Sequence, residues 1–83
     1  MRVTVLSPER TVFDGDAESV VAPAFDGEVG ILPRHAPFMT LLGEGRLVVR
    51  TPAAGARHFR VRGGFLQVVD DVVRVIADRA ETE

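Results

Sequence analysis

The sequence contains no cysteine and no lysine, and all ten of its basic residues are arginine. Without cysteine no disulfide can brace the fold, so the secreted, disulfide-rich class of small domains loses support and a reducing compartment is favoured. Without lysine, Schiff-base chemistry, lysine-bearing phosphate loops and the attachment of biotin or lipoate are excluded. The biotinyl and lipoyl carrier β-barrels, which have a similar length, need a lysine at a hairpin tip. The lack of lysine therefore excludes this class of protein as well.

Long apolar runs are also missing. No stretch approaches the 18 or so apolar residues of a membrane-spanning helix, so we expect no direct membrane insertion. The start of the chain does not resemble a signal peptide. A length of 83 residues predicts a single domain, residues 1–83. The net charge of −2 and the small number of aromatic residues disfavour nucleic acid as a partner. We therefore interpret the arginines at positions 46, 50, 57, 60 and 62 as a solvated, outward-facing stripe.

The dominant pattern of the sequence is an alternation of apolar and polar side chains with a period of two residues. Residues 2–6, 46–50, 57–62 and 72–76 alternate between apolar and polar side chains and are rich in β-branched residues. Turn signals separate these runs at roughly 8–12-residue intervals, which favours an all-β sandwich or barrel of mainly antiparallel strands. No segment keeps a helical period for ten residues, so we expect no substantial helix.

The alternation also predicts which side chains point inward. Leu47 and Val49 in one run, and Phe59 and Val61 in another, are expected in the core. The adjacent Gly63 and Gly64 indicate a bulge or a close backbone approach. Residues 20–25 (VVAPAF) are apolar on both faces, and Pro23 restricts the end of this strand to an edge or a turn. Such a strand is either covered on both faces or meets another protein, and as an edge it could pair with a second copy of itself.

Candidate chemistry is sparse. Glu28 and His35 are the one suggestive acid–base pair, but no nucleophile accompanies them, so we interpret His35 as a structural histidine bonded to the backbone of its own turn. The two histidines have no cysteine nearby, which disfavours zinc. The acidic pair at 70–71 is interpreted as a solvated hairpin turn and not as a calcium site. The glycine-containing turns precede no helix that could hold a phosphate. No catalytic residue, metal or cofactor is predicted.

With catalytic, metal and phosphate sites disfavoured, the remaining interpretation of the sequence is a binding module. Residues 27–37 (GEVGILPRHAP) form a proline-restrained segment, and such a segment loses little entropy when it is ordered against a partner. Ile31 and Leu32 would supply apolar contact, and Glu28 would select a cationic partner. This segment is the predicted contact surface.

Five ordered motifs carry a family resemblance. They are residues 7–15 (SPERTVFDG), 27–37 (GEVGILPRHAP), 45–49 (GRLVV), 63–68 (GGFLQV) and 73–80 (VRVIADRA). In this order, and over nearly the whole chain, they resemble the N-terminal β-sandwich domain of the epsilon subunit of F-type ATP synthase, the equivalent of the mitochondrial delta subunit. The resemblance implies a flattened sandwich of two mainly antiparallel sheets with about ten short strands.

The resemblance also implies a role. Such a domain is a non-catalytic rotor part of the central stalk, in the F1 sector of a proton-translocating synthase. It docks the gamma subunit onto the polar loops of the c-ring, reaches the alpha and beta subunits through the complex, and helps to couple ion translocation to ATP synthesis. The expected location is peripheral, on the cytoplasmic face of a bacterial inner membrane, with the chloroplast thylakoid as the less favoured setting. The alternative is a stand-alone β-sandwich module that binds an unrelated partner.

Site residues follow from the same motifs. The resemblance assigns contact with the c-ring to Glu28, Val29, Ile31 and Arg34, and contact with gamma to Ser7, His35 and Thr40. Position 34 departs from the family, which commonly has glycine or asparagine there. Arg34 must therefore either change the loop or adopt a positive φ, which disfavours the backbone by about 1 kcal/mol.

A second departure is the end of the chain. Most family members continue into a C-terminal helical hairpin that inhibits ATP hydrolysis and in some cases binds ATP, whereas this sequence stops at Glu83. We therefore expect no C-terminal helical hairpin, no ATP binding and no inhibition through such an arm.

Overall fold

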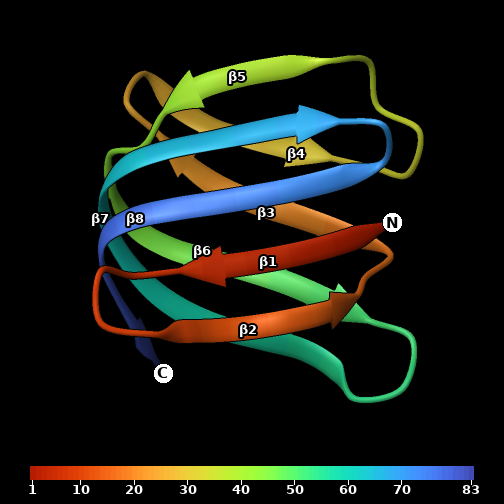
Figure 1. The fold of residues 1–83 in the computed structure, drawn as a ribbon, viewed down its shortest axis with the longest axis horizontal. Helices are drawn as coiled ribbons and strands as arrows, with labels where there is room; N and C mark the ends of the chain where they lie inside the picture. Colours follow the sequence, from red (N-terminus) through yellow and green to blue (C-terminus); the bar gives the residue numbers. More distant parts are fainter.

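A computed structural model describes residues 1–83 and contains eight strands and no helix (Figure 1). The strands are β1 (Arg2–Leu6), β2 (Thr11–Asp16), β3 (Ser19–Ala24), β4 (Gly27–Ile31), β5 (Phe38–Leu41), β6 (Glu44–Thr51), β7 (Gly55–Val69) and β8 (Val72–Thr82). No helix has the length and apolarity to cross a membrane. The all-β prediction is confirmed.

Two long strands build the sandwich, because β7 and β8 each run through both of its layers. The first part of β7 pairs with β6 as far as Arg62, whereas residues 65–68 pair with β5. In the same way β8 pairs with β1 over residues 72–76, and its remaining residues pair with β7 alone. One layer thus has the order β2-β1-β8-β7-β5 and the other β8-β7-β6-β3-β4. Counted by layer, the eight strands give the ten segments expected.

Glycine produces the bend between the layers. Gly63 and Gly64 have φ angles of 66° and 96°. A Cβ atom at Gly64 would lie 2.0 Å from the backbone oxygen of Ile76 on the adjacent strand, so no side chain fits there. The predicted close backbone approach is therefore confirmed, and it is the point at which the β7–β8 ribbon turns from one layer into the other.

The interior contains apolar side chains only. Seventeen residues are buried, and none of them is polar or charged. Leu47, Val49, Phe59 and Val61 are all fully buried, as the alternation predicts. The register explains this agreement, because Leu47 pairs with Phe59 across β6 and β7 and the two side chains therefore point to the same face.

Two predictions about faces are wrong. Residues 20–25 offer no free edge for a second copy, because β3 lies between β4 and β6, although Pro23 does lie at the end of β3, next to the β3–β4 turn. Arg57 does not point outward with the other arginines, because it has the parity of Phe59. Its guanidinium carbon lies 5.7 Å from the ring centre of Phe13 and 5.9 Å from that of Phe59, where it covers one end of the core.

Candidate docking surface

The segment predicted to be one contact loop is a strand followed by a loop. Residues 27–31 form β4, which pairs with β3, and residues 32–37 connect β4 to β5. Pro33 and Arg34 form the turn of this connection, and the backbone N–H of His35 donates to the oxygen of Leu32 at 3.2 Å. We call residues 32–37 the β4–β5 loop.

His35 is bonded to its own turn, as predicted. Its Nδ1–H donates to the backbone oxygen of Ala36 at 2.7 Å, and its ring packs 5.5 Å from the ring of Phe38. No hydrogen bond or ion pair joins it to Glu28. The half-buried imidazole therefore stiffens the loop and does not form the acid–base pair that was considered.

Arg34 adopts the positive φ that its position requires. Its φ angle is 64°, in the region that glycine and asparagine occupy most readily. The loop has therefore kept this conformation with an arginine in place, and the arginine side chain is exposed. Its backbone N–H donates to Oδ1 of Asp71 at 2.7 Å, a contact with the β7–β8 hairpin.

The remaining predicted ring contacts differ in accessibility. Glu28 is exposed on β4, directly opposite Pro23. Val29 is half-buried and packs against the core. The expectation that Ile31 supplies contact surface is wrong, because its side chain is 0% exposed. Ile31 pairs with the buried Val20 and faces the interior, as the strand period dictates once β4 is recognised as a strand.

The predicted gamma contacts are not brought together. His35 and Thr40 lie close in the chain, on the β4–β5 loop and on β5. Ser7 lies in the β1–β2 turn, at the other end of the molecule from that loop in Figure 1. There its hydroxyl donates to the backbone oxygen of Arg10 at 3.2 Å and borders an open, charged hollow of about 500 Å³. A partner that touches all three residues must extend along the sandwich.

An exposed apolar edge accompanies the loop. Phe25, Leu32, Met39 and Leu41 are between 61% and 66% exposed, more than any other large apolar side chain in the chain. They lie in the β3–β4 turn, in the β4–β5 loop and on β5, which together form the top of the molecule in Figure 1. The N–H of Phe25 donates to the oxygen of Leu41 at 3.0 Å, which ties the turn to β5. We call these four residues the apolar edge.

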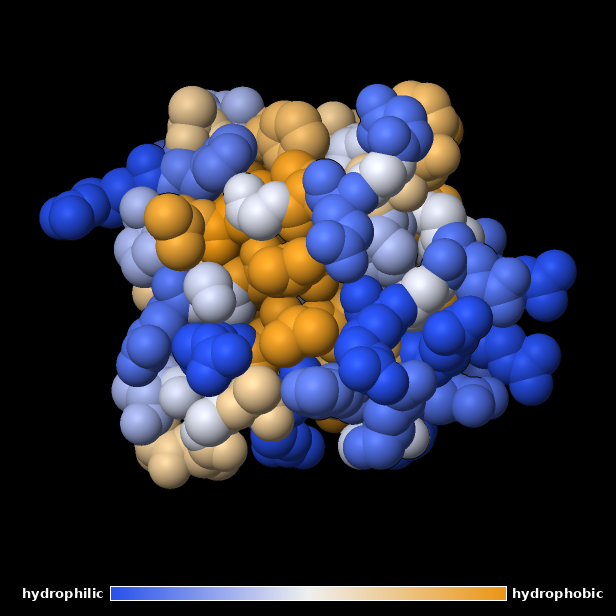
Figure 2. All heavy atoms as spheres, turned by 180° about the vertical axis from the view of Figure 1, so that it is seen from behind, coloured by the Kyte–Doolittle hydropathy of each residue, from blue (hydrophilic) through white to orange (hydrophobic).

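A second apolar area lies on the face of a sheet layer. Figure 2 shows the outer face of the layer that contains β3, β4 and β6, with apolar side chains at its centre and charged side chains around them. Val21 and Val48 face each other here across β3 and β6, and both are half-buried. Residues 20–25 thus present apolar surface through the face of an internal strand and not through a free edge.

A family model for the ATP synthase delta/epsilon chain β-sandwich domain matches residues 1–83. The chain belongs to this family. It is 43% identical over 81 residues to the ATP synthase epsilon chain of Nitrosococcus oceani, covering 98% of this chain and 58% of that protein. It is 46% identical over 80 residues to the epsilon chain of Rhodopirellula baltica, covering 96% and 62%. The chain therefore spans about three fifths of the curated relatives it matches.

Solved structures support the same fold. A chain in the cryo-EM structure of the Euglena gracilis mitochondrial ATP synthase OSCP/F1/c-ring assembly matches with a TM-score of 0.88 at 22% identity, covering 96% of this chain and 51% of that one. A chain from the central stalk and c-ring of the Tetrahymena thermophila mitochondrial ATP synthase matches with a TM-score of 0.80 at 18% identity, covering 96% and 64%. At these identities the likeness establishes the sandwich and not the details of a site.

Sequence reasoning missed Met39 and Leu41 of the apolar edge and identified Phe25 only as part of residues 20–25. Phe25, Met39 and Leu41 lie where apolar residues occur at both parities, so alternation does not separate an inward from an outward side chain. A signal was nevertheless present. Residues 38–42 (FMTLL) contain four large apolar residues, more than one inward face of a short strand can bury.

Proposed function

We propose that this chain is a non-catalytic subunit of the central stalk of an F-type ATP synthase, and that it docks the gamma subunit onto the c-ring. In this role it takes part in coupling ion translocation to ATP synthesis and reaches the alpha and beta subunits only through the complex. We further propose that it lies at the cytoplasmic face of a bacterial inner membrane, which fits its bacterial relatives. The whole complex, and not this chain, performs the reaction.

The observation that carries this proposal is the apolar edge beside a fixed loop. Four large apolar side chains, each more than 60% exposed, lie on one side of a small domain whose interior already holds seventeen buried residues. Apolar surface concentrated in this way is typical of a site that another protein covers. The adjoining Glu28, exposed on β4, adds a charge that favours a cationic loop on the partner.

Which residues contact which partner is also part of the proposal. We assign Glu28 and Arg34 to the c-ring, with Val29 in a supporting position, and Ser7, His35 and Thr40 to gamma. Ile31 is left out because its side chain has no surface to offer. The residues of the apolar edge alternate along the chain with those of both groups, so the edge would be covered when both partners are bound.

Affinity capture tests the proposal. The tagged chain is expressed in the organism that encodes it, the membranes are solubilised gently, and the captured proteins are identified and quantified. We expect gamma, the c-ring, alpha and beta in the proportions of a synthase. The double variant Met39→Ser/Leu41→Ser should lose most of this capture while remaining folded, because both side chains are exposed.

A matched control tests whether the loss of capture is specific to the apolar edge or follows from replacing any exposed apolar residue by serine. Ala53 and Ala54 are exposed apolar residues in the β6–β7 turn, at the opposite end of the molecule from β5 in Figure 1, and the double variant Ala53→Ser/Ala54→Ser should capture the synthase normally. Recovery of the wild-type chain alone, or with proteins unrelated to the synthase, would instead support the alternative of a stand-alone binding module. Equal loss in the edge variant and the control would contradict the assignment of the edge.

A further inference from the structure

The residues other than glycine that have left-handed backbone angles meet at one place in this protein. Only three residues other than glycine have a positive φ: Arg34 at 64°, Asp70 at 50° and Asp71 at 62°. Arg34 lies in the β4–β5 loop, and the two aspartates form the two-residue hairpin between β7 and β8. Positive φ at both hairpin positions is the geometry of a type I′ turn, which aspartate tolerates. Arginine has no such local compensation, so its conformation must be held by its surroundings.

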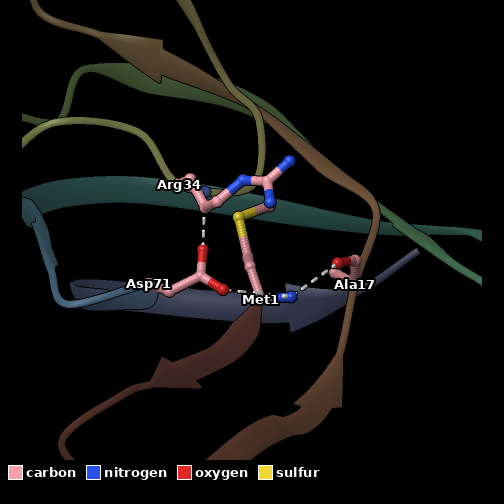
Figure 3. Close-up of polar contacts among 4 residues, drawn as sticks. All are labelled: Met1, Ala17, Arg34 and Asp71. Atoms are coloured by element: carbon pink, nitrogen blue, oxygen red, sulfur yellow. Dashed lines mark hydrogen bonds and ion pairs between the residues drawn. The ribbon is translucent and has the colours of Figure 1, made fainter.

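Asp71 supplies that hold. Its Oδ1 accepts the backbone N–H of Arg34 at 2.7 Å, across 37 positions of sequence (Figure 3). Its other oxygen lies 3.8 Å from the terminal amine of Met1, which in turn donates to the backbone oxygen of Ala17 at 3.3 Å. Figure 3 shows the carboxylate of Asp71 between Arg34 and Met1, so one side chain joins the loop to the body of the sandwich.

The loop has no comparable anchor elsewhere. The N–H of His35 bonds to Leu32 and its ring bonds to Ala36, and both contacts lie within residues 32–37. The ring of His35 also packs on Phe38, the first residue of β5. Asp71 is the one side chain outside the loop that forms a hydrogen bond with it. A charged acceptor makes this bond stronger than one between neutral groups.

We propose that Asp71 is a positioning residue: it holds Arg34 at positive φ and thereby fixes the conformation in which the β4–β5 loop meets its partner. Asp71 contacts no partner itself in this scheme. The consequence for docking rests on the proposed function, whereas the hold on the loop rests on the hydrogen bond alone. The hairpin and the docking loop are therefore one unit, although they are far apart in the sequence.

The experiment compares two adjacent aspartates. Glycine adopts positive φ freely, so Asp71→Gly and Asp70→Gly both remove a side chain without straining the hairpin, and only the first removes a bond to the loop. Asp71→Asn keeps an acceptor oxygen and tolerates the same φ. Amide exchange of Arg34 is measured by NMR in all three variants. Binding of purified gamma subunit from the same organism is measured by calorimetry, and binding of the detergent-solubilised c-ring by co-sedimentation.

We expect Asp71→Gly to speed exchange of the Arg34 amide by about tenfold or more and to weaken gamma binding several-fold. Asp70→Gly should leave both unchanged, and Asp71→Asn should restore most of both. Unchanged exchange in Asp71→Gly, or equal losses in Asp70→Gly, would overturn the proposal. Faster exchange with unchanged binding of both gamma and the c-ring would overturn the docking role. If the wild-type chain binds no gamma, the proposed function fails, and the exchange data alone decide whether Asp71 holds the loop.

Discussion

The interior and the apolar edge of this domain are made of the same kinds of side chain but obey different rules. Inside, Phe59 and Leu47 face each other in register and are fully buried. At the edge, Phe25 and Leu41 are joined through their backbones, yet both side chains stand in solvent. The difference shows that the exposed side chains of the apolar edge are not needed to fill the core. Apolar residues that the fold does not need are the ones available to another protein.

The largest effect is expected at the bend, where the interior leaves no room. In Gly64→Ala the new methyl group would meet the backbone oxygen of Ile76 at 2.0 Å, and alanine would also be strained at a φ of 96°. We expect the free energy of unfolding to fall by about 4 kcal/mol or more, which removes most of the stability of a small domain. Urea unfolding followed by circular dichroism measures this loss.

Gly30→Ala is the control for the bend, because a Cβ atom there has nothing within 4 Å and the φ angle of Gly30 is not positive. A stable, folded Gly64→Ala would show that the two layers can be joined without the close approach. In that case the interior would tolerate substitutions better than the comparison with the apolar edge implies.

The next effect is expected inside the core. Phe59→Ala removes a fully buried ring that packs edge-on against Phe13 at 5.9 Å. We expect a loss of about 3–5 kcal/mol from the free energy of unfolding, because a cavity remains. Phe25→Ala removes the same side chain at the edge and should change the unfolding free energy by less than about 0.5 kcal/mol. Similar losses in the two variants would abolish the distinction between interior and edge.

A substitution beside the edge should change binding and leave stability nearly unaltered. Glu28 is exposed and forms no ion pair, so Glu28→Arg should alter the free energy of unfolding by no more than about 0.5 kcal/mol. We expect it to weaken binding to the detergent-solubilised c-ring, measured by co-sedimentation, because a favourable charge becomes a repulsive one. Glu9→Arg makes the same change of charge in the β1–β2 turn and serves as the control. An unfolded Glu28→Arg would contradict the role of Glu28 as a surface residue.

The smallest effect has the opposite sign. Arg34→Gly places the residue best suited to positive φ at 64°, which relieves strain but also increases the entropy of the unfolded chain. We expect a net stabilisation of about 0.5 kcal/mol in thermal or urea unfolding. A loss of stability would mean that the arginine side chain contributes packing that its exposure does not reveal.

Local periodicity predicts the part of the structure that is itself local. Alternation placed Phe59 and Val61 in the core, and the paired glycines at 63 and 64 marked the bend. The strand period also predicts that Ile31 points inward, but it applies only if residues 27–31 are recognised as a strand. The interpretation of residues 27–37 as one loop therefore gives the wrong exposure for Ile31. The pattern of residues 20–25 leaves open whether β3 is covered or meets another protein, because its neighbours β4 and β6 are set by topology, which single-strand patterns do not encode.

The candidate site was predicted less completely, for the same reason. The position of Arg34 in the motif predicts either a changed loop or a positive φ, and the structure has the positive φ. The carboxylate that holds it comes from the hairpin, 37 residues further on. That pair of aspartates was expected only as a solvated turn. No spacing in the sequence links positions 34 and 71, because the link exists only after the layers have assembled.

The continuity of β7 and β8 through both layers has a mechanical consequence. In a sandwich joined only by loops, the two sheets can slide over each other when a side chain packs poorly. Here the layers share two covalent backbones and the ladder of hydrogen bonds between them. Sliding one sheet over the other would require that ribbon to shear at the glycine bend. A twisting load applied at β5 in one layer therefore reaches β6 in the other through a single continuous strand, β7, which would suit the rotor role proposed above.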